Sequence, residues 1–162
     1  MKRIAIYPGT FDPITKGHLD IVRRASKIVD VLIVAVAQDT GKTPLFTQDE
    51  RVEMAKHELI KFKNVKIVKF SGLVANFFRE QKANFVIRGI RTFGDFENEF
   101  SMAIANKKLY ENYETLFMPA MEIEQFTSST RVRSISALGG DISFYVSKYI
   151  KDKVQRKLKN KI

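Results

Sequence analysis

Short continuous apolar runs alternate along the chain with longer stretches in which apolar residues recur every three or four positions. The run Val31–Ala37 has no polar interruption, which is typical of a strand buried on both faces of a parallel sheet. Four more runs predict strands, at residues 4–7, 65–68, 85–87 and 115–118. The stretches between them have helical spacing, which predicts helices at about 19–29, 47–62, 73–81 and 95–111, and from about 129 until a break at Gly139-Gly140.

The order of these elements predicts the fold. Strand and helix alternate repeatedly, which indicates a parallel sheet with helices on both faces. The helix that begins after Thr47 carries a capping box, because Glu50 stands three residues later. We therefore predict an α/β fold, a single doubly wound Rossmann-like domain over residues 1–162 with a five-stranded parallel sheet.

Composition and charge limit the classes of function. The 162 residues suit one core and include no cysteine, which excludes disulfides, thiolate metal sites and a cysteine nucleophile. No apolar stretch approaches the ~20 residues of a membrane span, and the segment before Pro8 is too short for a signal peptide. We expect a cytoplasmic protein that binds no membrane.

The positive charge is concentrated at one end. Residues 148–162 form a predicted basic helix with seven Lys/Arg and one acid, so the rest of the chain carries only +4 of the formal net charge of +10. A solvated helix explains this pattern. A tail that binds polyanions is the alternative, but we expect no nucleic-acid partner.

Chemically versatile residues follow the strands. Right-handed crossovers place the loops after all parallel strands at one edge of the sheet, and ligands bind there, where the winding direction reverses. The loop after the first strand ends in Thr15-Lys16-Gly17-His18. An imidazole in the first turn of a helix can bind a phosphate, although a cap or core histidine is the alternative.

Two later loops carry similar chemistry. Arg88-Gly89-Ile90-Arg91 follows the fourth strand and suits bidentate phosphate binding, with a structural salt bridge as the alternative. After the fifth strand, Thr127-Ser128-Ser129-Thr130 places hydroxyls at a helix start, as a triphosphate site or as an N-cap run.

These strings resemble those of the nucleotidylyltransferase superfamily. Thr15-x-Gly17-His18 is similar to its (H/T)xGH signature, and Thr127–Arg133 is similar to ISSTxxR, with Thr127 in place of the usual Ile. The longer string Tyr7–His18 resembles that of bacterial phosphopantetheine adenylyltransferases. The resemblance extends from Lys2 to about Ile150.

The resemblance implies roles for individual residues. His18 would be catalytic, stabilising the transition state at the α-phosphate. The acceptor 4′-phosphopantetheine would be bound by Thr10, Lys42, Val74 and Arg88. ATP would be bound by Thr10, Phe11, His18, Gly89, Ile90, Arg91, Glu99, Glu124, Gln125, Phe126, Thr127, Ser128, Ser129 and Thr130. Glu124 stands where relatives commonly carry an aromatic residue.

The implied reaction is reversible transfer of AMP from ATP to 4′-phosphopantetheine, giving dephospho-coenzyme A and pyrophosphate. An ionised phosphate monoester needs neither a general base nor a protein nucleophile, so alignment and charge neutralisation suffice. Mg²⁺ would be bound mainly through ATP phosphates. The resemblance also implies a homohexamer and feedback inhibition by coenzyme A.

Three other functions are considered. The first is adenylyl or cytidylyl transfer to another phosphate monoester, such as nicotinamide mononucleotide. An aminoacyl-tRNA synthetase shares a similar signature, but this chain lacks room for tRNA-binding domains. A non-enzymatic nucleic-acid-binding protein would depend on the basic residues 148–162.

Overall fold

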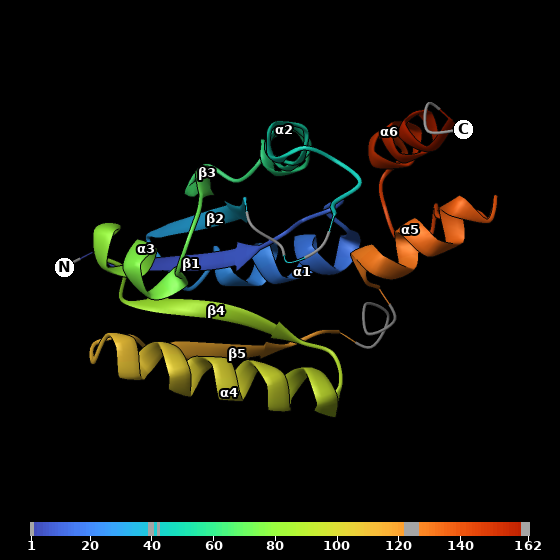
Figure 1. Cartoon of the computed structure of the whole chain (residues 1–162). Helices are drawn as coiled ribbons and strands as arrows, with labels where there is room; N and C mark the ends of the chain where they lie inside the picture. Colours follow the sequence, from blue (N-terminus) through green and yellow to red (C-terminus); the bar gives the residue numbers. More distant parts are fainter. Residues whose placement is uncertain (1, 39–40, 42, 122–126, 160–162) are drawn as a thin grey trace.

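The computed structural model describes residues 2–38, 41, 43–121 and 127–159. Its centre is a parallel sheet of five strands in the order β3-β2-β1-β4-β5 (Figure 1). The strands are β1 (Ile4–Gly9), β2 (Val31–Ala37), β3 (Val65–Phe70), β4 (Phe85–Ile90) and β5 (Thr115–Pro119). The predicted five-stranded parallel sheet is confirmed, and each predicted apolar run lies within one of these strands.

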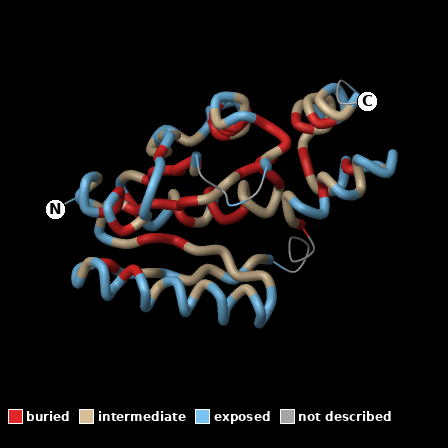
Figure 2. Tube along the Cα trace, in the orientation of Figure 1, coloured by how far each residue is buried: buried red, intermediate tan, exposed pale blue. Residues whose placement is uncertain are grey.

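Helices cover both faces of the sheet, as predicted. Leu32, Val34 and Val36 of β2 belong to a core that also contains residues of α1 (Lys16–Ala25), α2 (Gln48–Leu59), α5 (Ser129–Ala137) and α6 (Lys148–Lys159). The alternate residues Ile33 and Ala35 face the opposite core, which contains residues of α3 (Val74–Glu80). The inner residues of β1 and β2 are accordingly buried, and the residues at both ends of these strands are half-buried (Figure 2).

The strand order places the reversal of winding next to β1. The chain moves outward from β1 to β2 and β3, and then returns to the other side of β1 as β4. At the carboxyl ends of β1 and β4, the loops that leave the two strands therefore run in opposite directions. A crevice is expected at this switch point.

The basic helix α6 packs against the body of the protein. Ile150 and Val154, four residues apart, are buried in the core. Lys157 donates to Glu50 of α2 at 2.6 Å, and Lys153 donates to Glu53 at 3.1 Å. The prediction of a merely solvated helix was therefore incomplete, because one face of α6 belongs to the core.

Helix α4 (Phe93–Leu109) lies at the β5 end of the sheet (Figure 1). It exposes an unusual number of large apolar side chains: Phe93, Phe96, Phe100, Met102, Ile104 and Leu109. None of the helices in the described residues is both long and apolar enough to span a bilayer.

Candidate active site

A cavity of about 280 Å³ lies at the switch point, between the carboxyl ends of β1 and β4. The N-termini of α1 and α5 form its other walls, with His18 on one side and Ser128 to Thr130 on the other. We refer to it as the His18 cavity. Two helix N-termini contribute backbone N–H groups and positive dipole ends here, so the cavity suits a polyanion.

A second cavity of about 190 Å³ adjoins the first. It is lined by Thr10, Ala37 and Val74, among others, and we refer to it as the Thr10 cavity. The two cavities have Pro8, Gly9 and Arg88 in common. Two ligands bound side by side would therefore meet at the end of β1.

The local sequence fixes the orientation of the His18 ring. Thr15 is the N-cap of α1 and His18 is its third residue, where a capping box usually has Glu or Gln. The Thr15 backbone N–H donates to His18 Nδ1 at 3.0 Å, and the Thr15 hydroxyl lies 3.0 Å from the same nitrogen. Since Nδ1 accepts, the proton of the neutral ring is on Nε2, which can donate a hydrogen bond.

The electrostatic environment keeps this ring neutral. Burial, together with the smaller effect of the nearby positive charge of Arg91, lowers the pKa of His18 to about 4. At neutral pH the imidazole is thus a neutral hydrogen-bond donor with a fixed tautomer. Such a donor is suited to stabilising charge that develops on a phosphoryl oxygen.

The Phe11 ring packs against the His18 ring. It lies edge-on to the imidazole, with centroids 5.0 Å apart. The same ring fills the space beside Gly9, where an added Cβ would lie 2.9 Å from it. Gly9 is therefore required by packing against Phe11, and the Phe11 backbone has a φ of 50°, which is uncommon for a non-glycine residue.

Arg88 is held in place by an acid. Its Nε and Nη2 atoms each donate to Glu99 at 2.5 Å, and Nη1 donates to the Pro8 carbonyl at 2.9 Å. Glu99 raises the pKa of Arg88 through this hydrogen-bonded pair, in opposition to the effect of burial. The guanidinium is thus fixed and charged at the boundary of the two cavities.

Arg91 is likewise held in place by a carboxylate. Its Nε donates to Asp95 at 3.0 Å and its Nη1 donates to the Thr127 carbonyl at 3.3 Å. The arginine thereby ties the loop after β4 to the segment before α5. The salt-bridge alternative considered for Arg88 and Arg91 is realised for both, and both still line the His18 cavity.

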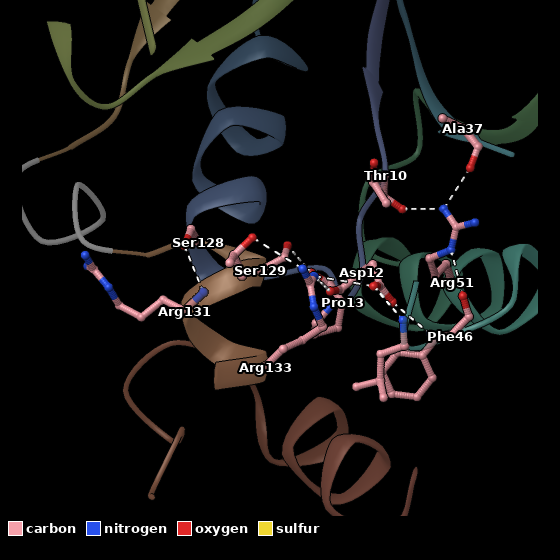
Figure 3. Close-up of polar contacts among 12 residues, drawn as sticks. Thr10, Asp12, Pro13, Ala37, Phe46, Arg51, Ser128, Ser129, Arg131 and Arg133 are labelled. Atoms are coloured by element: carbon pink, nitrogen blue, oxygen red, sulfur yellow. Dashed lines mark hydrogen bonds and ion pairs between the residues drawn. The ribbon is translucent and has the colours of Figure 1, made fainter. Parts of the chain in front are cut away.

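The hydroxyls before α5 divide between capping and tethering. Ser128 is the N-cap of α5 and accepts a hydrogen bond from the Arg131 N–H at 3.1 Å. Ser129 donates to the Pro13 carbonyl at 2.8 Å (Figure 3). Thr130 lines the His18 cavity, and Thr127 is buried beside Gly17. The α5 N-terminus is therefore shaped both by its own cap and by the loop after β1.

Comparison with known proteins gives a consistent result. A family model described as cytidylyltransferase-like matches residues 6–135. The phosphopantetheine adenylyltransferase of Azoarcus sp. (strain BH72) is 46% identical, over 98% of this chain and 97% of its own length. That of Thioalkalivibrio sulfidiphilus is 51% identical, over 91% and 92%. This chain belongs to the phosphopantetheine adenylyltransferase family.

Solved structures agree on the fold. A putative nicotinate-nucleotide adenylyltransferase from Vibrio parahaemolyticus superposes with a TM-score of 0.69 and 20% identity, covering 99% of this chain and 93% of its own. Plasmodium falciparum nicotinic acid mononucleotide adenylyltransferase, complexed with NaAD, has a TM-score of 0.69 at 16% identity, covering 99% and 96%. These similarities extend over nearly the whole chain.

Most residues that the family resemblance singled out lie at the two cavities. Phe11, His18, Gly89, Arg91, Glu99 and Thr127 to Thr130 line the His18 cavity, Thr10 and Val74 line the Thr10 cavity, and Arg88 lines both. Ile90 ends β4 but is not among the lining residues of either cavity. Lys42, Glu124, Gln125 and Phe126 lie outside the described residues.

Sequence reasoning missed two buried charges beside these cavities. Asp12 and Arg51 are 2% and 1% exposed, and they hold the loops together through hydrogen bonds to backbone groups. Asp12 stands inside the Tyr7–His18 string, and this position could have indicated that the residue is important for the site. Arg51 is in a helix rich in charged residues and gave no signal of burial.

Metal-binding side chains are not clustered at this site. The described residues contain no group of three or more His, Cys, Asp or Glu that could hold a metal ion. Glu99, the carboxylate that lines the His18 cavity, is paired with Arg88, and Asp95 is paired with Arg91. The described part of the protein therefore does not fit a dedicated metal cage.

Proposed function

We propose that this protein transfers the adenylyl group of ATP to the phosphate of 4′-phosphopantetheine, which gives dephospho-coenzyme A and pyrophosphate. Its relatives of that name match it along nearly the whole chain. ATP would occupy the His18 cavity, and the acceptor would occupy the Thr10 cavity. The shared wall at Pro8, Gly9 and Arg88 then brings the acceptor phosphate next to the α-phosphate.

The observation that carries this proposal is the state of His18. A neutral imidazole at a helix N-terminus, with Nδ1 occupied by Thr15, has one remaining function, to donate from Nε2. It is a poor general base, because its pKa is about 4. Adenylyl transfer from ATP to an ionised phosphate requires a hydrogen-bond donor rather than a general base.

The chemistry is a direct displacement. An acceptor phosphate oxygen forms a bond to the α-phosphorus of ATP, and the bond from this phosphorus to the bridging oxygen breaks, with its electron pair leaving on pyrophosphate. No covalent enzyme intermediate is needed, and the same contacts serve the reverse reaction. His18 stabilises the negative charge on the α-phosphoryl oxygens during the transfer.

The acceptor phosphate has a suitable partner in Arg88. A guanidinium has five N–H donors, and three of them are used in the contacts to Glu99 and Pro8. The remaining two would bind the acceptor phosphate, together with Lys42 and the Thr10 hydroxyl. Val74 would contact the pantetheine arm, since it lines the Thr10 cavity.

The nucleotide would be bound by groups around the His18 cavity. Gly89 and Ile90 at the end of β4, and Arg91 just after it, would contact it from one side. The N-terminus of α5, with Ser129 and Thr130, would bind the triphosphate, and residues 124–126 would contact the adenine. Mg²⁺ would be carried on the ATP phosphates, because the described side chains offer no cage for it.

A homo-oligomer, with the hexamer implied by family resemblance, is also proposed. The exposed apolar side chains of α4 support it, because a face with so many large apolar residues is costly to leave in water. Light scattering after chromatography would measure the assembly, and Phe100→Glu should shift it to smaller species. An unchanged mass would exclude this face as the contact.

We further propose that the enzyme acts in the cytoplasm and is inhibited by coenzyme A. Coenzyme A contains both the adenylate and the pantetheine parts of the product, so it could occupy both cavities together. Inhibition that is competitive with 4′-phosphopantetheine would agree with this. Inhibition unaffected by the acceptor concentration would contradict it.

The deciding experiment measures pyrophosphate release from ATP with separate acceptors. 4′-Phosphopantetheine should give turnover, whereas nicotinamide mononucleotide and nicotinate mononucleotide should give little. CTP in place of ATP tests the cytidylyl alternative with the same acceptor. Faster release with a mononucleotide acceptor, or with CTP, would replace the proposed substrates.

A further inference from the structure

Asp12 is a buried carboxylate that joins three separate parts of the chain. Its two oxygens accept hydrogen bonds from the backbone N–H groups of Leu45, at 2.8 Å, and Phe46, at 2.9 Å. One of them also lies 3.4 Å from Nη1 of Arg133. The loop after β1, the segment before α2 and helix α5 thus meet at one side chain (Figure 3).

Arg51 extends this network to the wall of the Thr10 cavity. From inside α2 its guanidinium donates to the carbonyls of Thr10 and Ala37, each at 2.7 Å, and to that of Phe46 at 3.2 Å. Thr10 and Ala37 both line the Thr10 cavity. Phe46 is therefore held at its N–H by Asp12 and at its carbonyl by Arg51, which links Asp12 to that wall.

Arg133 extends the network to the His18 cavity on the opposite side. Besides the Asp12 carboxylate, Arg133 Nη1 contacts the Asp12 carbonyl. The next carbonyl along the chain, that of Pro13, accepts a hydrogen bond from the Ser129 hydroxyl. Two adjacent carbonyls of the loop after β1 are thus bound by α5, whose N-terminal residues line the His18 cavity.

We propose that Asp12 and Arg133 form a positioning pair that sets the distance between the walls of the two cavities. This rests on the proposed function, since the two walls would hold the two reactants. Arg133 occupies the arginine position of the second signature, where a direct triphosphate contact would be the simple assumption. In this structure its guanidinium instead turns to Asp12 (Figure 3).

The physical reason is that alignment is sensitive to small displacements. Misplacing reacting groups by ~1 Å can reduce a rate by about 100-fold without abolishing binding. Losing either member of the pair would loosen the body of α5 against the loop after β1, although the Ser129 hydroxyl would still hold the start of the helix at Pro13. We therefore expect a loss in kcat rather than in ATP affinity.

The test is a double-mutant cycle with Asp12→Asn and Arg133→Met. Asparagine keeps the shape but presents an NH₂ group to one of the two backbone donors, and methionine keeps the stem of Arg133 without its charge. We expect each single variant to lower kcat by about 10- to 100-fold, with the KM for ATP within about threefold. The double variant should be no worse than the poorer single one, because coupled residues are not additive.

Arg156→Met on the exposed part of α6 is the matched control for charge loss, and it should behave like the original protein. If Arg133 bound the triphosphate directly, Arg133→Met would raise the KM for ATP more than tenfold. Asp12→Asn would then leave that KM unchanged, and the two effects would add. This result would overturn the proposal.

Amide exchange gives a readout that needs no activity. In Arg133→Met, the Leu45 and Phe46 amides should exchange at least tenfold faster, because the carboxylate that binds them has lost its cation. Unchanged exchange would refute the coupling even if Asp12→Asn failed to fold. Absence of pyrophosphate release from the original protein would instead refute the proposed function and leave the exchange result valid.

Discussion

Replacing His18 with alanine removes two things at once, a hydrogen-bond donor in the cavity and the acceptor that caps α1. The capping role is visible in the 3.0 Å bond from the Thr15 N–H to Nδ1. Loss of a capping interaction costs about 1 kcal/mol. Loss of one donor to a transition-state oxyanion costs about 2.7 to 4 kcal/mol, or 100- to 1,000-fold in kcat.

A second variant separates these two effects. Glutamine is a standard residue at this position of a capping box, so His18→Gln can accept from the Thr15 N–H as the ring does. We expect His18→Ala to lose both stability and turnover, and His18→Gln to recover stability while turnover stays well below that of the original protein. Urea unfolding measures the first quantity and pyrophosphate release measures the second.

Two outcomes would refute this reasoning. Near-normal turnover in His18→Ala would show that the ring is not the donor. Full recovery of turnover in His18→Gln would show that the ring only caps the helix. In either case the transition state would have to be stabilised by the helix N–H groups and arginines alone.

The pH dependence provides an independent check on the same residue. Because the pKa of His18 is lowered to about 4, the unfolded chain binds this proton more readily than the folded protein. This contribution to stability is present above pH 6.5 and is lost as the pH falls toward 4, by at most about 3 kcal/mol. His18→Gln should lack this part of the acid destabilisation.

The rate profile should be set by a different group. A phosphate monoester has a second pKa near ~6, so an acidic limb near that pH belongs to the acceptor and should be the same in His18→Gln. A limb that disappeared with the histidine would mean that His18 titrates near its ordinary pKa. The environment derived from burial and Arg91 would then be wrong.

Three further predictions concern other charges. Glu99→Gln should raise the KM for the acceptor about tenfold and leave that for ATP within threefold, because Arg88 loses its bidentate partner; equal changes in both KM values would contradict this. Arg51→Met should lower the free energy of unfolding by about 3 kcal/mol or more in urea titrations, since three carbonyls lose their donor, and a change below 1 kcal/mol would contradict it. Lys148→Glu with Arg156→Glu should leave turnover intact, and a loss of function together with steeply salt-dependent duplex binding would instead favour the nucleic-acid alternative.

The structure changes one test that the sequence suggested. Deleting residues 148–162 would be the direct test of the nucleic-acid-binding alternative, because that function would depend on these basic residues. Because Ile150 and Val154 are buried in the core, deletion would expose apolar surface worth about 1.5 to 3 kcal/mol for each side chain. Loss of function after deletion would then reflect unfolding, so charge reversal on exposed positions is the better experiment.

The sequence predicted the sheet well because its signals are local. A run such as Val31–Ala37 has no alternative to burial on both faces, and each predicted helix is bounded by caps or by neighbouring strands. The crevice followed from topology, since parallel strands with right-handed crossovers leave their loops at one edge. The order of the strands could not be deduced from local patterns, because it depends on which connection crosses from one side of the first strand to the other.

The buried charges could not be predicted either, because their burial depends on contacts between segments that are distant in the sequence. Arg51 lies in the charged sequence Gln48–Glu53 and has the appearance of a surface residue. Its burial is tolerated only because Thr10, Ala37 and Phe46 each direct a carbonyl at it, and these lie in the loop after β1, at the end of β2 and in the segment before α2. No local pattern encodes such an arrangement.

The pairing of the arginines has a consequence for how two polyanions are held together. Arg88, Arg91 and Arg133 are each paired with a carboxylate, Glu99, Asp95 and Asp12 respectively, so these three cations do not add an uncompensated field at the two cavities. The attraction must then come largely from directed N–H groups: those left on the fixed guanidiniums, those at the starts of α1 and α5, and Nε2 of His18. Such groups are already oriented before the substrates arrive and need little reorganisation as charge moves from the acceptor toward pyrophosphate. A site built in this way favours the transition state by geometry more than by net charge, which is why loss of alignment through Asp12 or Arg133 is expected to reduce kcat while binding persists.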